Sequence, residues 1–435
     1  KLRIVINLNL SFPMRKTLII LEKKQLFMED FSNLTLNKVT IVMTSMSRWD
    51  GEFSSASWSL AKTFAQNQKV IYVDYPFTLL DYIKERKKPS VIARKKALLN
   101  GKESLKPLAQ FSPLLYTLCP PLMLPINWLP PGLLYNYLSK WNDRRLAKSI
   151  KKAIQGLGEE NFIFFNSFNP LYLSRLPINF KPLSFVYQSR DNIRALEPYL
   201  RKHGAGKEIE AVKNANLSLV TSRMLQKDLE SLSGKKVAYF PNAADFDLFK
   251  TAYGEQLPPP EDLKDIPRPL IGYTGNICHR LDYNLIESIC KGNPDKSIVL
   301  VGPRNHQGHT NIDLDKIPNL FFTGPKKIEQ LPQYLAHFQL LILPFLCNEV
   351  TKSIYPLKIN EYLASGKPIV ATPFSEDIKS FYPLISLEKT PEKFNEAIEK
   401  EIETDSDKKA KSRYREASNN TWKGRVKLFW ELITR

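Results

Sequence analysis

The chain has 435 residues, of which 43% are hydrophobic and 25% are charged, and its formal net charge is +19 at pH 7. This length exceeds one ordinary hydrophobic core, so we expect a globular protein with two domains. The four cysteines lack paired C-x-x-C spacing and the five histidines are scattered, which argues against a disulfide framework and a metal site. No apolar run approaches the ~20 residues that a transmembrane helix needs.

Residues 1–37 are expected to be an extension that precedes the first domain. A basic start, Met14 to Lys16, is followed by an apolar run that is too short for a signal peptide. Together with the unpaired cysteines, this predicts a cytoplasmic protein.

The first domain is expected over residues 38–248 and opens as a β-α-β unit. Its apolar patterns predict a strand, a helix and a second strand in turn, at 38–43, 57–67 and 69–73. The loop after the first strand lies where open α/β sheets bind ligands. Four of its residues are candidates for a ligand cleft: Arg48, Trp49, Asp50 and Gly51. An ordinary loop that turns at Gly51 is the alternative.

Two basic segments, residues 84–106 and 140–152, flank a stretch at 119–135 that is rich in proline, leucine and aromatic residues. A basic helix is expected at 137–155. Apolar residues beside basic ones are typical of proteins that bind an anionic membrane surface, here the inner face of the membrane. A proline-rich loop beside a solvated helix is the alternative. No recognised nucleic-acid module accompanies the charge, so nucleic acid is not an expected partner.

Four further strands are expected in the first domain, at 161–166, 183–187, 217–221 and 237–240. Gln188 and Asp191 follow the second of these strands. A carboxylate at the carboxyl end of a strand suits a contact with an acceptor hydroxyl, and the same residue type also caps helices. Both interpretations of Asp191 are open at this stage.

Three consecutive prolines at 258–260 mark the linker into the second domain, which is expected over residues 249–417. Its first strand ends in a turn that contains glycine. Gly272 and Gly275 are predicted to let the backbone approach a phosphate closely. Asn276 and Arg280 follow them as further candidate contacts.

Residues 353–372 carry the most informative pattern in the chain. Pro356 suits the first position of a helix, and Gly366 suits the position just past its end. A short buried strand is expected at 369–371. Tyr355 is a poor side-chain cap, so the first backbone amides of the helix lack a local acceptor.

Lys358 and Glu361 suggest what this helix binds. A cation in the first turn is unfavourable by about 0.3–1 kcal/mol, because the helix dipole is already positive there. An anion at this end would satisfy both the amides and Lys358. Glu361, one turn further on, can accept hydrogen bonds from a diol, so the pair fits a nucleotide-sugar site. Two surface residues would show the same spacing.

This segment resembles the donor-site signature of GT-B glycosyltransferases of family 4, the glycosyl transferases group 1. The shared pattern is Pro-Leu-Lys-x-x-Glu-Tyr-Leu-Ala-x-Gly-Lys-Pro. The resemblance extends over residues 38–435 and implies an α/β fold, with two Rossmann-like domains that face each other across a cleft. It also implies that a last helix, within residues 418–435, crosses back to the first domain.

The resemblance implies that Glu361 binds the nucleotide ribose and that amides near Leu357 and Lys358 face the diphosphate. Ser353 stands where the family often has a glutamate that touches the sugar. The expected donor contacts are Gly275, Asn276, Arg280, Asn348, Ser353, Pro356, Leu357, Lys358 and Glu361. The expected acceptor side of the cleft comprises Arg48, Trp49, Asp50, Gly51 and Gln188. Asp191 is the candidate catalytic residue.

The implied function is transfer of a sugar from a nucleotide-diphospho-sugar, such as a UDP- or GDP-sugar, to a glycan or lipid-linked acceptor. The family acts with retention and without a required metal, so we expect no metal and no other cofactor. The setting would be synthesis of cell-surface polysaccharide or glycolipid. A nucleotide-sugar epimerase of the same architecture is one alternative. A non-catalytic sugar-nucleotide-binding protein, suggested by Ser353, is the other.

Overall fold

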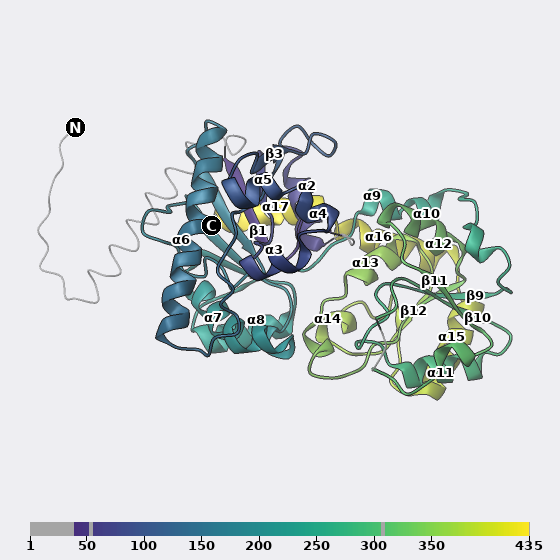
Figure 1. The fold of residues 1–435 in the computed structure, drawn as a ribbon. Helices are drawn as coiled ribbons and strands as arrows, with labels where there is room; N and C mark the ends of the chain where they lie inside the picture. The colour runs from purple at the N-terminus through teal and green to yellow at the C-terminus, as the bar shows by residue number, and fades with distance from the viewer. Residues whose placement is uncertain (1–38, 52–54, 306–308, 435) are drawn as a thin grey trace, which may run out of the picture.

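The computed structural model describes residues 39–51, 55–305 and 309–434, so the expected extension at 1–37 lies outside the described residues. The chain forms two α/β domains that lie side by side, each built around one sheet (Figure 1). This confirms the predicted fold class of two Rossmann-like domains.

The sheet of the first domain has eight strands in the order β3-β4-β2-β1-β5-β6-β7-β8. Its strands are β1 Thr40–Ser45, β2 Val70–Val73, β3 Leu105–Pro107, β4 Leu115–Leu118, β5 Phe162–Ser167, β6 Ser184–Ser189, β7 Leu217–Val220 and β8 Ala238–Tyr239. All neighbours pair in parallel except β3 and β4, which are antiparallel. The sequence did not predict β3 and β4, because these strands have only 3 and 4 residues and show no clear apolar period.

The helices of the first domain cover both faces of this sheet. They are α2 Ala56–Phe64, α3 Leu79–Glu85, α4 Pro89–Ile92, α5 Lys95–Asn100, α6 Leu133–Gly156, α7 Ala205–Asn214 and α8 Arg223–Ser233. The predicted start of the basic helix at residue 137 was wrong, because α6 already begins at Leu133. Leu133 and Leu134 are exposed, so they do not lie on the buried face of α6 and do not extend its periodic apolar pattern.

The sheet of the second domain has six strands in the order β11-β10-β9-β12-β13-β14. They are β9 Leu270–Thr274, β10 Ser297–Val301, β11 Leu320–Gly324, β12 Leu340–Leu343, β13 Ile369–Ala371 and β14 Ser386–Leu387. The helices of this part of the chain are α9 Phe246–Phe249, α10 Thr251–Gly254, α11 Tyr283–Gly292, α12 Leu331–His337, α13 Leu357–Ala364, α14 Glu376–Lys379, α15 Pro391–Glu403 and α16 Asp407–Asn419.

The last helix, α17 (Trp422–Ile433), packs on the first domain and not on the domain that precedes it (Figure 1). Phe429 is buried in one hydrophobic cluster with Ile41 of β1 and Phe64 of α2. The rings of Phe64 and Phe429 lie 4.9 Å apart in an edge-to-face arrangement, which is a favourable geometry for aromatic pairs. The apolar side of α17 thus ties the end of the chain to the first domain.

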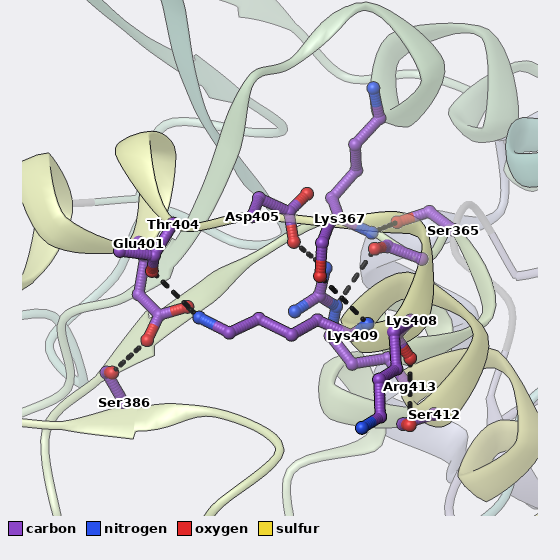
Figure 2. Close-up of polar contacts among 12 residues, drawn as sticks. Ser365, Lys367, Ser386, Glu401, Thr404, Asp405, Lys408, Lys409, Ser412 and Arg413 are labelled. Carbon is purple, nitrogen blue, oxygen red and sulfur yellow. Dashed lines mark hydrogen bonds and ion pairs between the residues drawn. The ribbon is translucent and has the colours of Figure 1, made fainter.

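Helix α16 holds the carboxyl end of α13 through a buried arginine (Figure 2). Arg413 of α16 donates from Nε to the carbonyl oxygen of Gly366 at 2.9 Å and forms an ion pair with Asp405. Gly366 lies just past α13 at φ 70°, where glycine avoids steric strain. A cation at the negative end of the helix dipole is favourable, so Arg413 stabilises α13 at its carboxyl end.

We expect Arg413→Met to lower the free energy of unfolding by about 1–3 kcal/mol, because the variant leaves a buried carbonyl and a carboxylate without their charged donor. The urea midpoint measures the loss. Arg415→Met, at an exposed position of the same helix, is the control and should stay within about 0.5 kcal/mol of the wild type. Equal midpoints for the two variants would contradict this role of Arg413.

Candidate nucleotide-sugar site

The amino end of α13 has no side-chain cap. Pro356 is the N-cap residue, at φ −74° and ψ 111°, so the prediction that it occupies the first helical position was off by one residue. Tyr355 is buried, and its hydroxyl contacts Oδ1 of Asn360 at 3.2 Å. The amide of Ile359 donates to the carbonyl of Pro356 at 3.2 Å, so the amides of Leu357 and Lys358 are the ones available to a ligand.

Glu361 lies one turn into α13, with its side chain only 2% exposed. Its Oε2 lies 3.2 Å from Nζ of Lys358, whose side chain is 26% exposed. Both residues line a cavity between the domains. The alternative of two surface residues is therefore wrong for Glu361. An anionic group of a ligand could replace Glu361 as the partner of Lys358, and a ligand hydroxyl could replace Lys358 as the donor to Glu361.

Tyr362 and two glycines join α13 to the loop after β9. The hydroxyl of Tyr362 accepts a 2.7 Å hydrogen bond from the amide of Thr274. Gly275, at φ 145°, lies so close to Lys358 that a Cβ atom would be 3.1 Å from Cε of that lysine. A Cβ at Gly302 would lie 1.8 Å from the carbonyl oxygen of Gly275. Glycine is therefore required at Gly302 for these two loops to touch.

Gly272 does not contribute to a phosphate site, contrary to the prediction. It lies within β9, where a Cβ atom would come 2.2 Å from the ring of Phe338. The glycine therefore makes room for a core side chain.

The first of two neighbouring cavities in the cleft has a volume of about 620 Å³. The first domain contributes an aromatic wall, in which the ring of Trp58 lies 6.3 Å from Trp49 and 5.3 Å from Phe111. The second domain contributes the glycine loop, Glu361 and the segment that begins at Lys326. A cavity lined by aromatic rings and a buried carboxylate suits a nucleoside, which has an apolar base and a ribose with hydroxyls.

The second cavity, of about 530 Å³, adjoins the first, because Lys358 and Asn276 line both. Arg190 and Asp191 come from the first domain, and Arg280 comes from the second. An oxygen of Asp191 lies 3.9 Å from Nη2 of Arg280 across the cleft. Nε of Arg280 is buried and has no hydrogen-bond partner among the described residues, so an anionic ligand would satisfy it.

Asp191 is not a helix cap. The short helix that follows is capped by Asn192, whose side chain accepts from the amide of Arg194. The capping interpretation was therefore wrong, and Asp191 is left in the cavity wall.

Two residues of the predicted cleft loop point into the first domain instead. The guanidinium of Arg48 lies 3.5 Å from the ring centroid of Phe77 and donates to the carbonyl of Tyr75. Asp50 binds both terminal nitrogens of Arg94, at 2.8 and 2.7 Å. These contacts shape the loop, while its other members, Trp49 and Gly51, do line the first cavity.

Gln188, Asn348 and Ser353 also differ from their predicted places. Gln188 is buried behind the cavity wall, where it accepts from Ser167. Oδ1 of Asn348 accepts from two amides of its own loop, and the buried hydroxyl of Ser353 donates to the carbonyl of Val350. These side chains hold the backbone of their segments. In each case the polar side chain hydrogen-bonds to a neighbouring group of the protein and is not left for a ligand.

Sequence reasoning missed Arg190, His279 and the aromatic residues Trp58 and Phe111, all of which line the cavities. The sequence offered one indication for Arg190, its position next to Asp191 after a strand. It offered none for Trp58 and Phe111, because an aromatic residue in an apolar pattern is typical of a hydrophobic core.

A buried carboxyl group supports the strand that carries Arg190. Oε1 of Glu208 accepts from the hydroxyls of Ser189 and Tyr187, at 2.7 and 3.1 Å. Burial raises the pKa of Glu208 from its ordinary 4.5 to about 7, against the effect of these hydrogen bonds and of Arg194. Asp191 raises it further.

Within residues 39–51, 55–305 and 309–434, no group of three or more His, Cys, Asp or Glu side chains is placed to hold a metal ion. None of the helices described here is both long and apolar enough to cross a bilayer.

The two largely parallel sheets and the cleft between them define the GT-B fold class. Sucrose-phosphate synthase from Thermosynechococcus elongatus has a TM-score of 0.58 and 13% identity, with 91% of this chain and 96% of that chain covered. The E. coli trehalose-6-phosphate protein bound with UDP-2-fluoro glucose has a TM-score of 0.64 and 9% identity, with 91% of this chain and 99% of that chain covered. Anabaena HepE in complex with UDP has a TM-score of 0.57 and 14% identity, with 91% of this chain and 98% of that chain covered. At identities this low, these structural similarities show the fold alone.

Residues 268–403 match the family model of glycosyl transferases group 1, which confirms the resemblance predicted from the sequence. The chain is also 26% identical over 194 residues to the putative teichuronic acid biosynthesis glycosyltransferase TuaH of Bacillus subtilis (strain 168). That match covers 44% of this chain and 48% of TuaH, so the chain spans about half the length of this curated relative.

We expect Glu208→Gln to change how stability depends on pH. A folded-state pKa raised to about 7 means that the native state binds more protons than the unfolded state between pH 4.5 and 7. The free energy of unfolding of the wild type therefore falls as the pH rises from 4.5 to 7. The variant should lack the part of this fall that Glu208 contributes, on the order of 1–3 kcal/mol, in urea titrations from pH 5 to 8, while the buried Asp143, whose pKa is also raised to about 7, contributes equally to both proteins. Parallel curves for both proteins would contradict the raised pKa.

Proposed function

We propose that the protein is a glycosyltransferase that moves a sugar from a nucleotide-diphospho-sugar to a glycan or lipid-linked acceptor. The observation that carries this proposal is the buried Glu361, one turn past an uncapped helix start that bears Lys358, in a cleft between two Rossmann-like domains. We assign the acceptor to residues 38–248 with 418–435, and the donor to residues 249–417.

The donor would lie across both cavities. Glu361 would accept hydrogen bonds from the ribose hydroxyls, and the amides of Leu357 and Lys358 would donate to the diphosphate. Arg280, with its unpartnered buried Nε, would bind the same diphosphate. These fixed positive groups would stabilise the charge that develops on the leaving nucleotide, without a metal ion.

Asp191 would meet the acceptor hydroxyl from the opposite wall. We propose a retaining reaction, as the resemblance implies. The UDP ligands of two similar folds support a UDP-sugar donor. The name of the partial relative, teichuronic acid biosynthesis, supports a role in cell-surface polysaccharide.

We expect Glu361→Gln to weaken binding of the preferred nucleoside diphosphate by about 10- to 100-fold, because hydrogen bonds to a charged acceptor contribute roughly 1.5–3 kcal/mol. A thermal-stabilisation screen selects the nucleotide, and calorimetry gives the Kd. The control is Glu396→Gln, at an exposed position of α15, which should bind like the wild type.

The 2′,3′-dideoxy form of the same nucleotide tests the assigned contact. It should bind weakly to the wild type, and Glu361→Gln should weaken it no further. Independent losses from the two changes would place Glu361 away from the ribose and sink the assignment.

The epimerase alternative has one observation in its favour. His279 and His309 line the second cavity with their rings 5.4 Å apart, and histidines serve as acids and bases. Incubation with a nucleotide sugar and no acceptor decides between the two. Epimer formation would replace the transferase proposal.

We further propose that α6 binds the inner face of an anionic membrane. Its exposed face carries apolar side chains toward the amino end, with Leu133 91% exposed, and the nearby Trp128 is 71% exposed. The same face continues with exposed basic residues: Lys140, Arg144, Arg145, Lys148, Lys151 and Lys152. The one carboxylate of α6, Asp143, is buried. Figure 1 shows α6 on the side of the first domain away from the second.

We expect the wild type to float with liposomes that contain anionic lipid and to float less with neutral ones. Replacing Lys148, Lys151 and Lys152 together by Gln should lower partitioning by about 100-fold, at roughly 1 kcal/mol per residue. The matched control replaces Lys393, Lys400 and Lys411 by Gln, which are exposed on the second domain. Equal flotation of both triple variants would refute α6 as the binding face.

A further inference from the structure

The first domain places an arginine in the cleft that the proposed donor does not need. Arg190 directly follows β6 and lines the second cavity. The groups assigned to the diphosphate, namely Lys358, Arg280 and the α13 amides, all lie on the opposite wall. Arg190 is therefore on the side assigned to the acceptor.

The contacts of Arg190 leave its charge without a carboxylate partner. Nε and Nη2 donate to Oε1 of Gln188 at 3.3 and 3.2 Å, and this acceptor is a neutral amide. Among the described residues no carboxylate forms an ion pair with Arg190, and the adjacent Asp191 instead lies near Arg280. Burial lowers the pKa of Arg190 to about 10, and the opposing electrostatic effects of Tyr72 and the adjacent Asp191 offset this only in part.

Gln188 is itself held by a row of buried hydroxyls. Its Oε1 accepts from Ser167 at 2.8 Å. The Ser167 hydroxyl lies 3.2 Å from that of Ser57, which accepts from Ser45 at 2.9 Å. Such a connected network fixes its members in place. The guanidinium is therefore preorganised at the cavity wall, and the two bonds to Gln188 use only two of its five N–H groups.

We propose that Arg190 binds an anionic group, a carboxylate or a phosphate, on the sugar acceptor. A planar guanidinium forms paired hydrogen bonds with such groups. This inference rests on the proposed function and adds to it the chemical class of the acceptor. Arg190 would select acidic over neutral acceptors, while Lys358 and Arg280 serve the donor.

The test uses the full chain, saturated with the nucleoside diphosphate that stabilises it most, and three matched probes: glucose, glucuronate and glucose 6-phosphate. Calorimetry should show at least one of the two anions binding roughly 10-fold or more tightly than glucose. The two anions distinguish a carboxylate from a phosphate. Arg190→Gln should abolish this preference, and Arg175→Gln, at an exposed position of the first domain, should keep it.

Gln188→Glu provides a second variant that retains the arginine. The new carboxylate would pair with Arg190 and compete with the ligand, so the preference for the anion should also fall. The nucleotide Kd should change less than about twofold in both variants, within the scatter expected of a site that is not touched.

Three outcomes would overturn the inference. The first is that the wild type binds neither anion, or binds both no more tightly than glucose. The second is that the anion preference survives Arg190→Gln. The third is that Arg190→Gln weakens nucleotide binding alone, which would make Arg190 a donor contact. Failure of the proposed function is seen separately, because the wild type would then either bind no nucleoside diphosphate in the first step or form an epimer from the nucleotide sugar alone.

Discussion

The fixed orientation of α13 is the constraint on which the cleft depends. Its amino end carries uncapped amides and Lys358, and its carboxyl end is held by Arg413 through the carbonyl of Gly366. Tyr362 ties its middle to the amide of Thr274. A positive charge at the positive end of a helix is unfavourable without a counter-ion. The fold therefore keeps a local electrostatic conflict that Glu361 relieves in part and that an anionic ligand would relieve further.

The two walls of the cleft differ in physical character. The second domain offers backbone amides, glycines and a buried carboxylate, which suit a polar ligand with phosphates and hydroxyls. The first domain offers an aromatic wall around Trp58 and, further along, the cation Arg190. Asp191 and Arg280 face each other from the two walls at 3.9 Å. A ligand that fills the cleft would therefore contact both domains.

The sequence specified much of this arrangement because several signals are local. The helix with Lys358 and Glu361, the stop at Gly366 and the buried strand after it depend on neighbours within a few residues. The division into two parallel sheets followed from alternating apolar strands and helices. Residues 105–118 resisted prediction, because β4 is placed by its pairing with β2 and β3 by its pairing with β4, rather than by a periodic pattern.

What the sequence determined by itself is the helix that carries Lys358 and Glu361, since its residues and its stop at Gly366 are local signals. What only the tertiary structure decided is which polar side chains reach the cleft. Arg48 and Asp50 found partners inside the first domain, whereas Arg190 remained at the cavity wall. The physical reason is that a side chain takes the nearest group that satisfies its charge or hydrogen bonds, and distant segments provide those groups only after the chain has folded.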